Sequence, residues 1–407
     1  MNKLIIPSGL KDYYGDTLIF KKHIEHLIHK VFKEYNYTMV STPSLEFANL
    51  YEGKDTFQVL DNNELLSLRY DMTPSIARLF STYFKKTKPS RFCYIENSFR
   101  TGNKNHGILR EFTQAGAELI GVNSLESTSE ILVVAINSLL NTGLVNFKIN
   151  VGNTNFITSI LNYEIKKGNL FIETAGEIKK ELVKGNFIEP ENIILNSKCE
   201  KQTKEIFSKL PRLTGSLEIL EEIDTYTEKY DQPVKESITS LKELYELLEN
   251  YDVSDFINFD LSITGEQYYT GIIFHGYCQN VGQSIVDGGR YNNMLKEFGV
   301  DLPAVGFAIN INGLLDGLYE KGHEEPNKTL VIINKGSGTL PYKIMEGMRN
   351  EGKVLELYFG TLDKETIKDY CINNDFGGVL HFIDKDKCEV LNISTMNVDM
   401  VDINQML

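Results

Sequence analysis

Apolar residues recur every three to four positions in several stretches of the chain, which is the period of an amphipathic helix. Between residues 17 and 35 they fall at Phe20, Ile24, Leu27, Ile28, Val31 and Phe32. A second helical pattern covers residues 124–140. Residues 155–255 are also mostly helical in pattern, and one helix there is expected to follow Pro233, because proline favours the first turn of a helix.

Shorter apolar or alternating runs predict strands at 37–41, 92–95, 112–120, 147–151, 272–274 and 304–309. The runs 58–61 and 64–68 flank Asn62-Asn63, which predicts a β-hairpin. The runs 92–95 and 112–120 flank a loop rich in Gly and Asn, so we expect a second antiparallel pair. The dominant pattern is therefore a mixture of long helices and antiparallel strands.

The last 80 residues follow a different pattern. Residues 321–327 are polar and are interpreted as a linker. From 328 to 407 strand and helix patterns alternate, which predicts a small α/β domain. The segment 335–339, Lys-Gly-Ser-Gly-Thr, lacks a full phosphate-binding fingerprint and is interpreted as a plain turn.

Composition narrows the classes of protein that this chain can represent. Apolar and charged fractions of 42% and 24% are those of a globular protein, which excludes disorder. No run of eighteen apolar residues and no basic-then-apolar amino terminus is present, so we expect a cytoplasmic location and no membrane partner. The five cysteines form no Cys-x-x-Cys pair, which favours free thiols over a metal site or disulfides. The net charge of −14 argues against a nucleic-acid partner.

Two places carry candidate chemistry. Arg100 and Arg110 flank the loop between the runs 92–95 and 112–120, and two guanidiniums facing one cleft suit a carboxylate or a phosphate. A surface hairpin with two solvated arginines is an equally good interpretation. Thr73 is placed to cap a helix that has Pro74 at its first position, but capping does not account for the neighbouring Asp71.

These residues resemble a known family. Phe99-Arg100, a nine-residue loop and Arg110-Glu-Phe resemble motif 2 of class II aminoacyl-tRNA synthetases, and Gln114-Ala-Gly-Ala-Glu118 narrows the resemblance to the histidyl-tRNA synthetase branch. The helix, strand and proline of residues 17–43 are similar to motif 1, which builds the dimer interface in that family. Residues 287–291 (Asp-Gly-Gly-Arg-Tyr) and 304–309 (Ala-Val-Gly-Phe-Ala-Ile) are similar to its histidine-binding loop and motif 3.

The resemblance covers residues 1 to about 320 and implies the domain organisation. It predicts an α+β fold, with a class II synthetase-like antiparallel sheet flanked by helices and a helical insertion at about 165–255. Residues 328–407 resemble a reduced anticodon-binding domain. Over residues 326–407 there are nine Lys and Arg against twelve Asp and Glu, which is a poor surface for RNA.

The resemblance also implies a set of histidine-binding residues. Asp71 and Thr73 match the positions that hold the α-ammonium, and Arg100 and Gln114 match positions near the carboxylate. The residues expected around the imidazole are Glu118, Tyr268, Tyr269 and Tyr291. An acid and phenol hydroxyls are groups that a ring with two nitrogens can bond.

The positions that contact ATP in the synthetases have changed. Gly102, Asn103 and Lys104 stand where the motif 2 loop carries Glu-Arg-Pro, and Thr264 stands in place of an arginine at the α-phosphate. Gly313 stands in place of the motif 3 arginine at the γ-phosphate. Losing one preorganised donor reduces a rate roughly a hundred- to a thousandfold. We therefore expect a protein that binds histidine and does not catalyse its activation, with neither a cofactor nor a metal.

A histidine pocket on a synthetase scaffold without its ATP contacts resembles the regulatory subunits of ATP phosphoribosyltransferase, a synthetase-like family of histidine biosynthesis. This resemblance implies a short-form catalytic subunit as partner, a hetero-octamer, self-association as a dimer, and histidine as the feedback effector. Two alternatives remain open, a divergent histidyl-tRNA synthetase and a free-standing module that senses histidine or tRNA.

Overall fold

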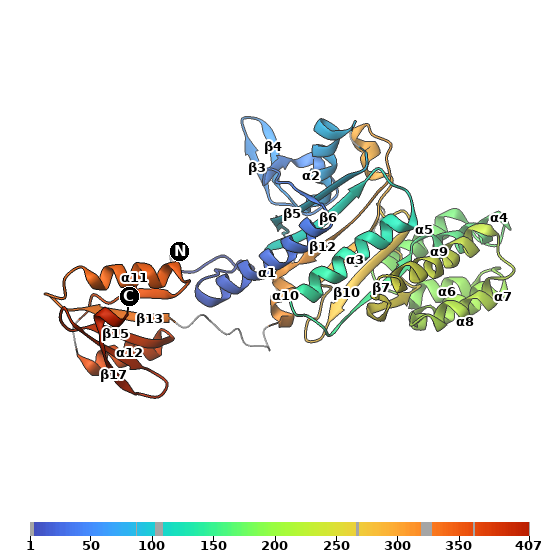
Figure 1. The fold of residues 1–407 in the computed structure, drawn as a ribbon. Coiled ribbons are helices and arrows are strands. Elements are labelled where there is room, and N and C mark those ends of the chain that lie inside the picture. Colours follow the sequence, from blue (N-terminus) through green and yellow to red (C-terminus); the bar gives the residue numbers. More distant parts are fainter. Residues whose placement is uncertain are drawn as a thin grey trace. The chain divides into compact units, whose positions relative to one another are not determined.

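The computed structural model describes residues 4–86, 88–101, 109–265, 268–318, 328–360 and 363–406. The chain forms two compact units, Met1–Lys321 and Gly322–Leu407 (Figure 1). The expected linker at 321–327 lies outside the described residues, as do Gly102, Asn103 and Lys104 of the motif 2-like loop. Within the described part of the chain, no helix is both long enough and apolar enough to cross a membrane.

A nine-stranded sheet forms the centre of the first unit. Neighbouring strands are antiparallel, except that β1 pairs in parallel with β5 and β7 with β9. In spatial order the strands are β1 (Thr38–Met39), β5 (Ser90–Phe99), β6 (Glu111–Ile120), β12 (Ala304–Asn310), β11 (Val286–Arg290), β10 (Ile272–Cys278), β7 (Phe147–Asn153), β9 (Ile257–Asp260) and β8 (Thr214–Gly215). The predicted antiparallel pair around the motif 2-like loop is confirmed as β5 and β6.

One face of this sheet packs against long helices and forms the main core (Figure 1). These are α1 (Gly15–Glu34), α3 (Leu125–Asn141) and α9 (Gln232–Glu249). The predicted stripe on α1 is confirmed, since Ile24, Ile28 and Phe32 are fully buried. The side chain of Ser124 caps α3 by accepting a hydrogen bond from the backbone N–H of Ser127. The positions of α1 and α3 thus follow from their apolar stripes.

The opposite face of the sheet carries α2 (Met72–Leu79) and the segment that follows β11, which together form a second apolar cluster. Beside α2 lies a three-stranded sheet in the order β2 (Leu45–Phe47), β4 (Glu64–Leu68), β3 (Gln58–Asp61). Asn62 and Asn63 both have positive φ, 45° and 69°, as the two central residues of a type I′ turn require. The predicted hairpin is therefore confirmed.

Helices fill the stretch between β7 and β9. In addition to α9 they are α4 (Asn155–Lys166), α5 (Ile172–Val183), α6 (Ile188–Asn196), α7 (Lys201–Lys209) and α8 (Glu218–Thr227). They share a buried polar centre: the Glu164 carboxylate accepts hydrogen bonds from the Thr203 hydroxyl, the Asn169 amide and the backbone N–H of Glu200. A short helix, α10 (Ile311–Leu318), follows β12 directly.

The second unit contains a five-stranded sheet with two helices. Its spatial order is β14 (Val354–Leu357), β13 (Lys328–Ile333), β15 (Phe376–Phe382), β16 (Lys387–Asn392) and β17 (Val398–Asp402), and the helices are α11 (Leu340–Asn350) and α12 (Lys364–Asn373). The first three strands are parallel, as expected of alternating strands and helices. Residues 335–339 form a turn in which Ser337 donates hydrogen bonds to Asn334 and Phe382 carbonyls. Sequence analysis missed β16 and β17.

Candidate functional site

The α2 face of the large sheet holds a buried carboxyl group, Glu118. It is 1% exposed. The Thr73 hydroxyl donates a hydrogen bond to Glu118 Oε1 at 2.9 Å, and the Tyr291 hydroxyl donates to Glu118 Oε2. Burial raises the pKa of Glu118 to about 8; the two hydrogen bonds act in the opposite direction, and the nearby Asp71 adds to the rise.

Space for this carboxyl group depends on a glycine. Gly306 lies opposite Glu118 in the β6–β12 register. A Cβ at position 306 would stand 1.7 Å from Glu118 Oε2, so no larger residue fits without moving the carboxyl group. The motif 3-like segment therefore shapes the site through its backbone.

Asp71 and Thr73 lie at the start of α2, and the structure corrects the predicted cap. Asp71 is the N-cap residue, with its side chain accepting from the backbone N–H of Thr73, and Met72 is the first helical residue. Pro74 is consequently the third residue of the helix. The predicted cap was wrong because the helix begins two residues earlier than expected. The Thr73 hydroxyl is thereby left to bond Glu118.

Aromatic residues close the site on the side of β11. Tyr291, 3% exposed, follows the strand directly, and burial raises its pKa well above the ordinary value. Tyr268 and Tyr269 have ring centroids 4.1 Å apart. Burial also raises the pKa of Tyr269, and Asp71 and Glu118 contribute through their charge. The phenols of Tyr269 and Tyr291 therefore remain neutral hydrogen-bonding groups at physiological pH.

Gln114 lies on β6, and Arg100 directly follows β5. Gln114 is buried on the same face as Glu118, and its Oε1 accepts from the Ser98 hydroxyl at 2.6 Å. The Arg100 guanidinium lies over the rings of Tyr70 and Phe112, with centroid distances of 4.7 and 4.9 Å. Among the described residues, no group accepts a hydrogen bond from the buried Arg100 Nε. The Nε–H group is therefore a candidate donor to an anionic ligand.

The second arginine, Arg110, takes a separate position. Its guanidinium lies over the ring of Phe57 at 4.4 Å, and it donates from Nη1 to the Ser8 carbonyl. The backbones of the two arginines meet, since the Arg100 N–H donates to the Arg110 carbonyl. Each guanidinium thus stacks on its own aromatic surface.

The described positions that match the ATP contacts carry no arginine. Thr264 follows β9, and its buried hydroxyl has no hydrogen-bond partner among the described residues. Gly313 lies in the first turn of α10, where Asn310 Oδ1 accepts from the backbone N–H groups of Asn312 and Gly313. Gly313 is therefore part of the local hydrogen bonding at the start of α10.

Two residues at or near the site escaped sequence analysis. Tyr94 is fully buried on β5 beside Glu118, and it was hidden in an apolar run that indicated only a strand. Arg290 is 8% exposed, and its guanidinium donates to five oxygen atoms, those of Val122, Asn123, Ser124, Ser127 and Thr128. Burial lowers the pKa of Arg290 to about 10. This arginine joins β11 to the start of α3.

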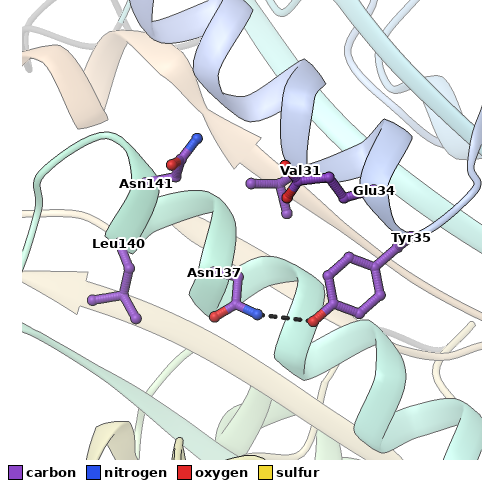
Figure 2. Close-up of a pocket in the computed structure, with 6 residues that line it drawn as sticks. All are labelled: Val31, Glu34, Tyr35, Asn137, Leu140 and Asn141. Carbon is purple, nitrogen blue, oxygen red and sulfur yellow. Dashed lines mark hydrogen bonds between the residues drawn. The ribbon is translucent and has the colours of Figure 1, made fainter.

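Surface depressions lie elsewhere on the first unit. One, with a volume of about 420 Å³, lies between α1 and α3 and contains none of the candidate residues (Figure 2); it is lined by Val31, Glu34, Tyr35, Asn137, Leu140 and Asn141. The Asn137 amide donates to the Tyr35 hydroxyl across it. No group of three or more His, Cys, Asp or Glu with metal-binding geometry occurs among the described residues.

Comparisons with known proteins identify the family to which this chain belongs. The family model for histidyl-tRNA synthetase matches residues 9–314. A protein of Caldanaerobacter subterraneus subsp. tengcongensis, named ATP phosphoribosyltransferase regulatory subunit, is 33% identical over 87% of this chain and 94% of its own length. One of the same name from Acetivibrio thermocellus is 30% identical over 100% of this chain and 99% of its own. The chain belongs to the family of ATP phosphoribosyltransferase regulatory subunits.

A solved structure supports the same assignment. The ATP phosphoribosyltransferase regulatory subunit/histidyl-tRNA synthetase from Bacillus halodurans superposes with a TM-score of 0.79 at 25% identity, over 93% of this chain and 98% of that one. The predicted α+β, class II synthetase-like fold is therefore confirmed. Because the relatives in this family are named as regulatory subunits, the predicted non-catalytic role is confirmed at the level of the family. The histidine-binding residues remain predictions.

Proposed function

We propose that this chain assembles with a short-form ATP phosphoribosyltransferase catalytic subunit and makes its activity sensitive to histidine. The relatives' shared name supports a catalytic partner. The proposed assembly is a hetero-octamer in which this chain is present as homodimers. The five cysteines are free thiols, which favours the cytoplasm as its location.

The observation that carries the proposal is the cluster of Thr73, Glu118 and Tyr291. A buried carboxyl group held by two hydroxyls is a costly arrangement for a scaffold alone, and it suits a ligand with ring nitrogens. Asp71 lies near it to receive an ammonium, and Arg100 Nε, which has no acceptor among the described residues, is a candidate donor to a carboxylate. At the same time Thr264 and Gly313 offer no charge to a triphosphate.

Regulation follows if histidine binds one arrangement of the complex better than another. A coupling free energy of about 1–3 kcal/mol, or five- to 150-fold in affinity, is enough for strong inhibition. The same coupling must act in reverse, so the state of the catalytic subunit changes the affinity for histidine. This reciprocity separates a regulatory role from simple scaffolding.

Reconstitution tests the proposal. The purified chain is mixed with the short catalytic subunit from the same source, and phosphoribosyl transfer to ATP is measured with and without histidine. We expect activity that requires this chain and decreases with histidine. Absence of a complex and of any rescue would contradict the proposal. Histidine-dependent exchange of pyrophosphate into ATP would then support the synthetase alternative, and salt-sensitive RNA binding the sensor alternative.

A further inference from the structure

The hydroxyl group of Tyr94 is enclosed by the protein and has no hydrogen-bond partner among the described residues. The side chain is 0% exposed, so bulk water does not reach the oxygen. Most buried hydroxyls in native proteins are hydrogen-bonded, because an unpaired one destabilises the fold. An unpaired hydroxyl in the middle of a proposed binding site therefore points to a ligand atom.

The surroundings of this hydroxyl are those of the proposed histidine site. Tyr94 packs in the same apolar cluster as Met72 of α2 and Tyr291. Gly116 is its direct partner across the β5–β6 pair, and a Cβ at position 116 would stand 2.4 Å from both Cζ and the hydroxyl oxygen of Tyr94. Glu118 is two residues further along β6, on the same face of the strand.

We propose that Tyr94 is a ligand-recognition residue of this site, whose hydroxyl bonds the imidazole nitrogen that does not face Glu118. The inference rests on the proposed function, because it assumes that histidine binds beside Glu118. An imidazole presents two nitrogens on different edges, and a site that bonds both distinguishes it from rings that carry one nitrogen or none. Glu118 supplies one partner and Tyr94 the other.

The chemistry of the phenol suits this role. Burial, together with the charges of Glu118 and Asp71, raises the pKa of Tyr94 well above its ordinary value, so the hydroxyl keeps its proton throughout the physiological range. A neutral hydroxyl both donates and accepts, and it can pair with either tautomer of the ring. Because the oxygen is enclosed, the ring must displace a neighbouring side chain to reach it.

The test is Tyr94→Phe, which removes only the hydroxyl. Calorimetry with L-histidine should show the dissociation constant rising roughly five- to hundredfold. The melting temperature without ligand should stay unchanged or rise, since the lost group has no partner in the protein. A merely structural role predicts the reverse pattern, a lower melting temperature with unchanged affinity.

Tyr230→Phe is the matched control. Tyr230 is 5% exposed, and its hydroxyl shares a 2.6 Å hydrogen bond with Thr203 among the helices between β7 and β9. This variant should melt at a lower temperature and bind histidine as the unmodified chain does. Tyr94→Phe is thus expected to lower histidine affinity without lowering stability, and Tyr230→Phe to lower stability without changing histidine affinity.

Ligand analogues provide the second measurement. Thiazolylalanine isomers in which sulfur replaces one or the other ring nitrogen should both bind the unmodified chain more weakly than histidine. The isomer that lacks the nitrogen facing Tyr94 should bind the Tyr94→Phe variant and the unmodified chain with the same affinity, because the hydrogen bond is already absent. Equal histidine affinity of Tyr94→Phe and the unmodified chain would overturn the inference and leave the proposed function intact. Absence of histidine binding by the unmodified chain, alone and in the reconstituted complex, would instead refute the proposed function and the inference with it.

Discussion

Glu118 is buried where its charged form is poorly solvated, and both of its oxygens accept hydrogen bonds from hydroxyl groups. Glu118→Gln keeps the size of the side chain and removes its ability to ionise. If this group bonds a ring nitrogen of histidine, calorimetry should show affinity reduced by about 1–3 kcal/mol, the cost of leaving a buried polar group without its matching partner. Circular dichroism should show an intact fold.

Glu130→Gln is the control for this variant. Glu130 pairs with Arg91 in a bidentate contact, at 2.8 Å to each oxygen, and lies outside the candidate site. Glu130→Gln should lower the stability of the fold without changing histidine affinity. If Glu118→Gln binds histidine as tightly as the unmodified chain, Glu118 does not contact histidine and the binding site lies elsewhere.

The raised pKa of Glu118 also predicts a pH dependence of stability. The folded-state value of about 8 lies above the unfolded value of 4.5, so the native state binds the proton more tightly. The contribution of this group to stability is full below about pH 4.5 and decreases as pH rises toward 8, by about 1.4 kcal/mol per pH unit at most. Urea unfolding without histidine, from pH 5 to 8.5, should show the unmodified chain losing stability relative to Glu118→Gln. A pH-independent difference would contradict the assignment.

A gain-of-function prediction concerns the lost ATP contacts. Thr264→Arg combined with Gly313→Arg restores the two arginines, yet pyrophosphate exchange should remain barely detectable, because the motif 2-like loop still reads Gly102-Asn103-Lys104. A Cβ at position 313 meets Ile285 Cγ2 at an ordinary 3.5 Å, so Gly313→Ala serves as the folding control. Robust exchange would show that the loop matters less than the two arginines.

At single positions, sequence analysis succeeded where a pattern fixes a residue's environment. The run 112–120 was predicted as a strand and is confirmed as β6, on which Gln114 and Glu118 are both buried on one face, since residues four apart along a strand share a face. It failed at the α2 cap, because Asp71 and Thr73 both satisfy the rules for a cap and only the backbone path decides between them. Tyr94 was missed because burial of a hydroxyl without a partner is a tertiary property.

At the scale of elements, Arg290 connects β11 with the loop and first turn of α3. Its guanidinium lies at 2.7 Å from Thr128 Oγ1 and 2.8 Å from both Ser127 Oγ and the Ser124 carbonyl. Lysine cannot reproduce this set, since its single ammonium has no planar fork of donors. Arg290→Lys should therefore lower the free energy of unfolding by about 2–3 kcal/mol.

Chemical denaturation measures this loss, and Arg349→Lys is the comparison. Arg349 is partly exposed and pairs with Glu346 one helical turn away, so its replacement should change stability by no more than about 0.5 kcal/mol. Similar effects of the two substitutions would mean that the contacts of Arg290 contribute little beyond an exposed ion pair.

Elements with strong local signals were predictable, and those without them were not. The β3–β4 hairpin follows from Asn62-Asn63, which tolerate positive φ. The strands β16 and β17 are short and rich in charged residues, and Val398 and Met400 remain more than half exposed. Within the second unit β16 pairs with β15 and β17 pairs with β16, and no clear alternation in the sequence indicates this register.

For the whole molecule, the three-stranded sheet β2–β4–β3 presents an apolar face to solvent. In the strand register Leu45 faces Leu68, and both Phe47 and Val59 face Leu66, so these five side chains lie on one face. Phe47 is 58% exposed, Val59 49% and Leu45 44%. An apolar face of this kind on a small sheet is typical of a protein interface.

This face includes β2, which comes two residues after the motif 1-like segment 17–43, and the last prediction links it to the proposed homodimer. Two-fold symmetry allows the same patch to serve both protomers, so one substitution acts twice. Phe47→Ser should weaken self-association by about 2 kcal/mol or more per protomer, measured by sedimentation equilibrium. Val354→Ser, at a 43% exposed position on the edge strand β14, is the control and should leave the dimer unchanged. If Phe47→Ser dimerises as tightly as the control, the protomers meet through a different surface.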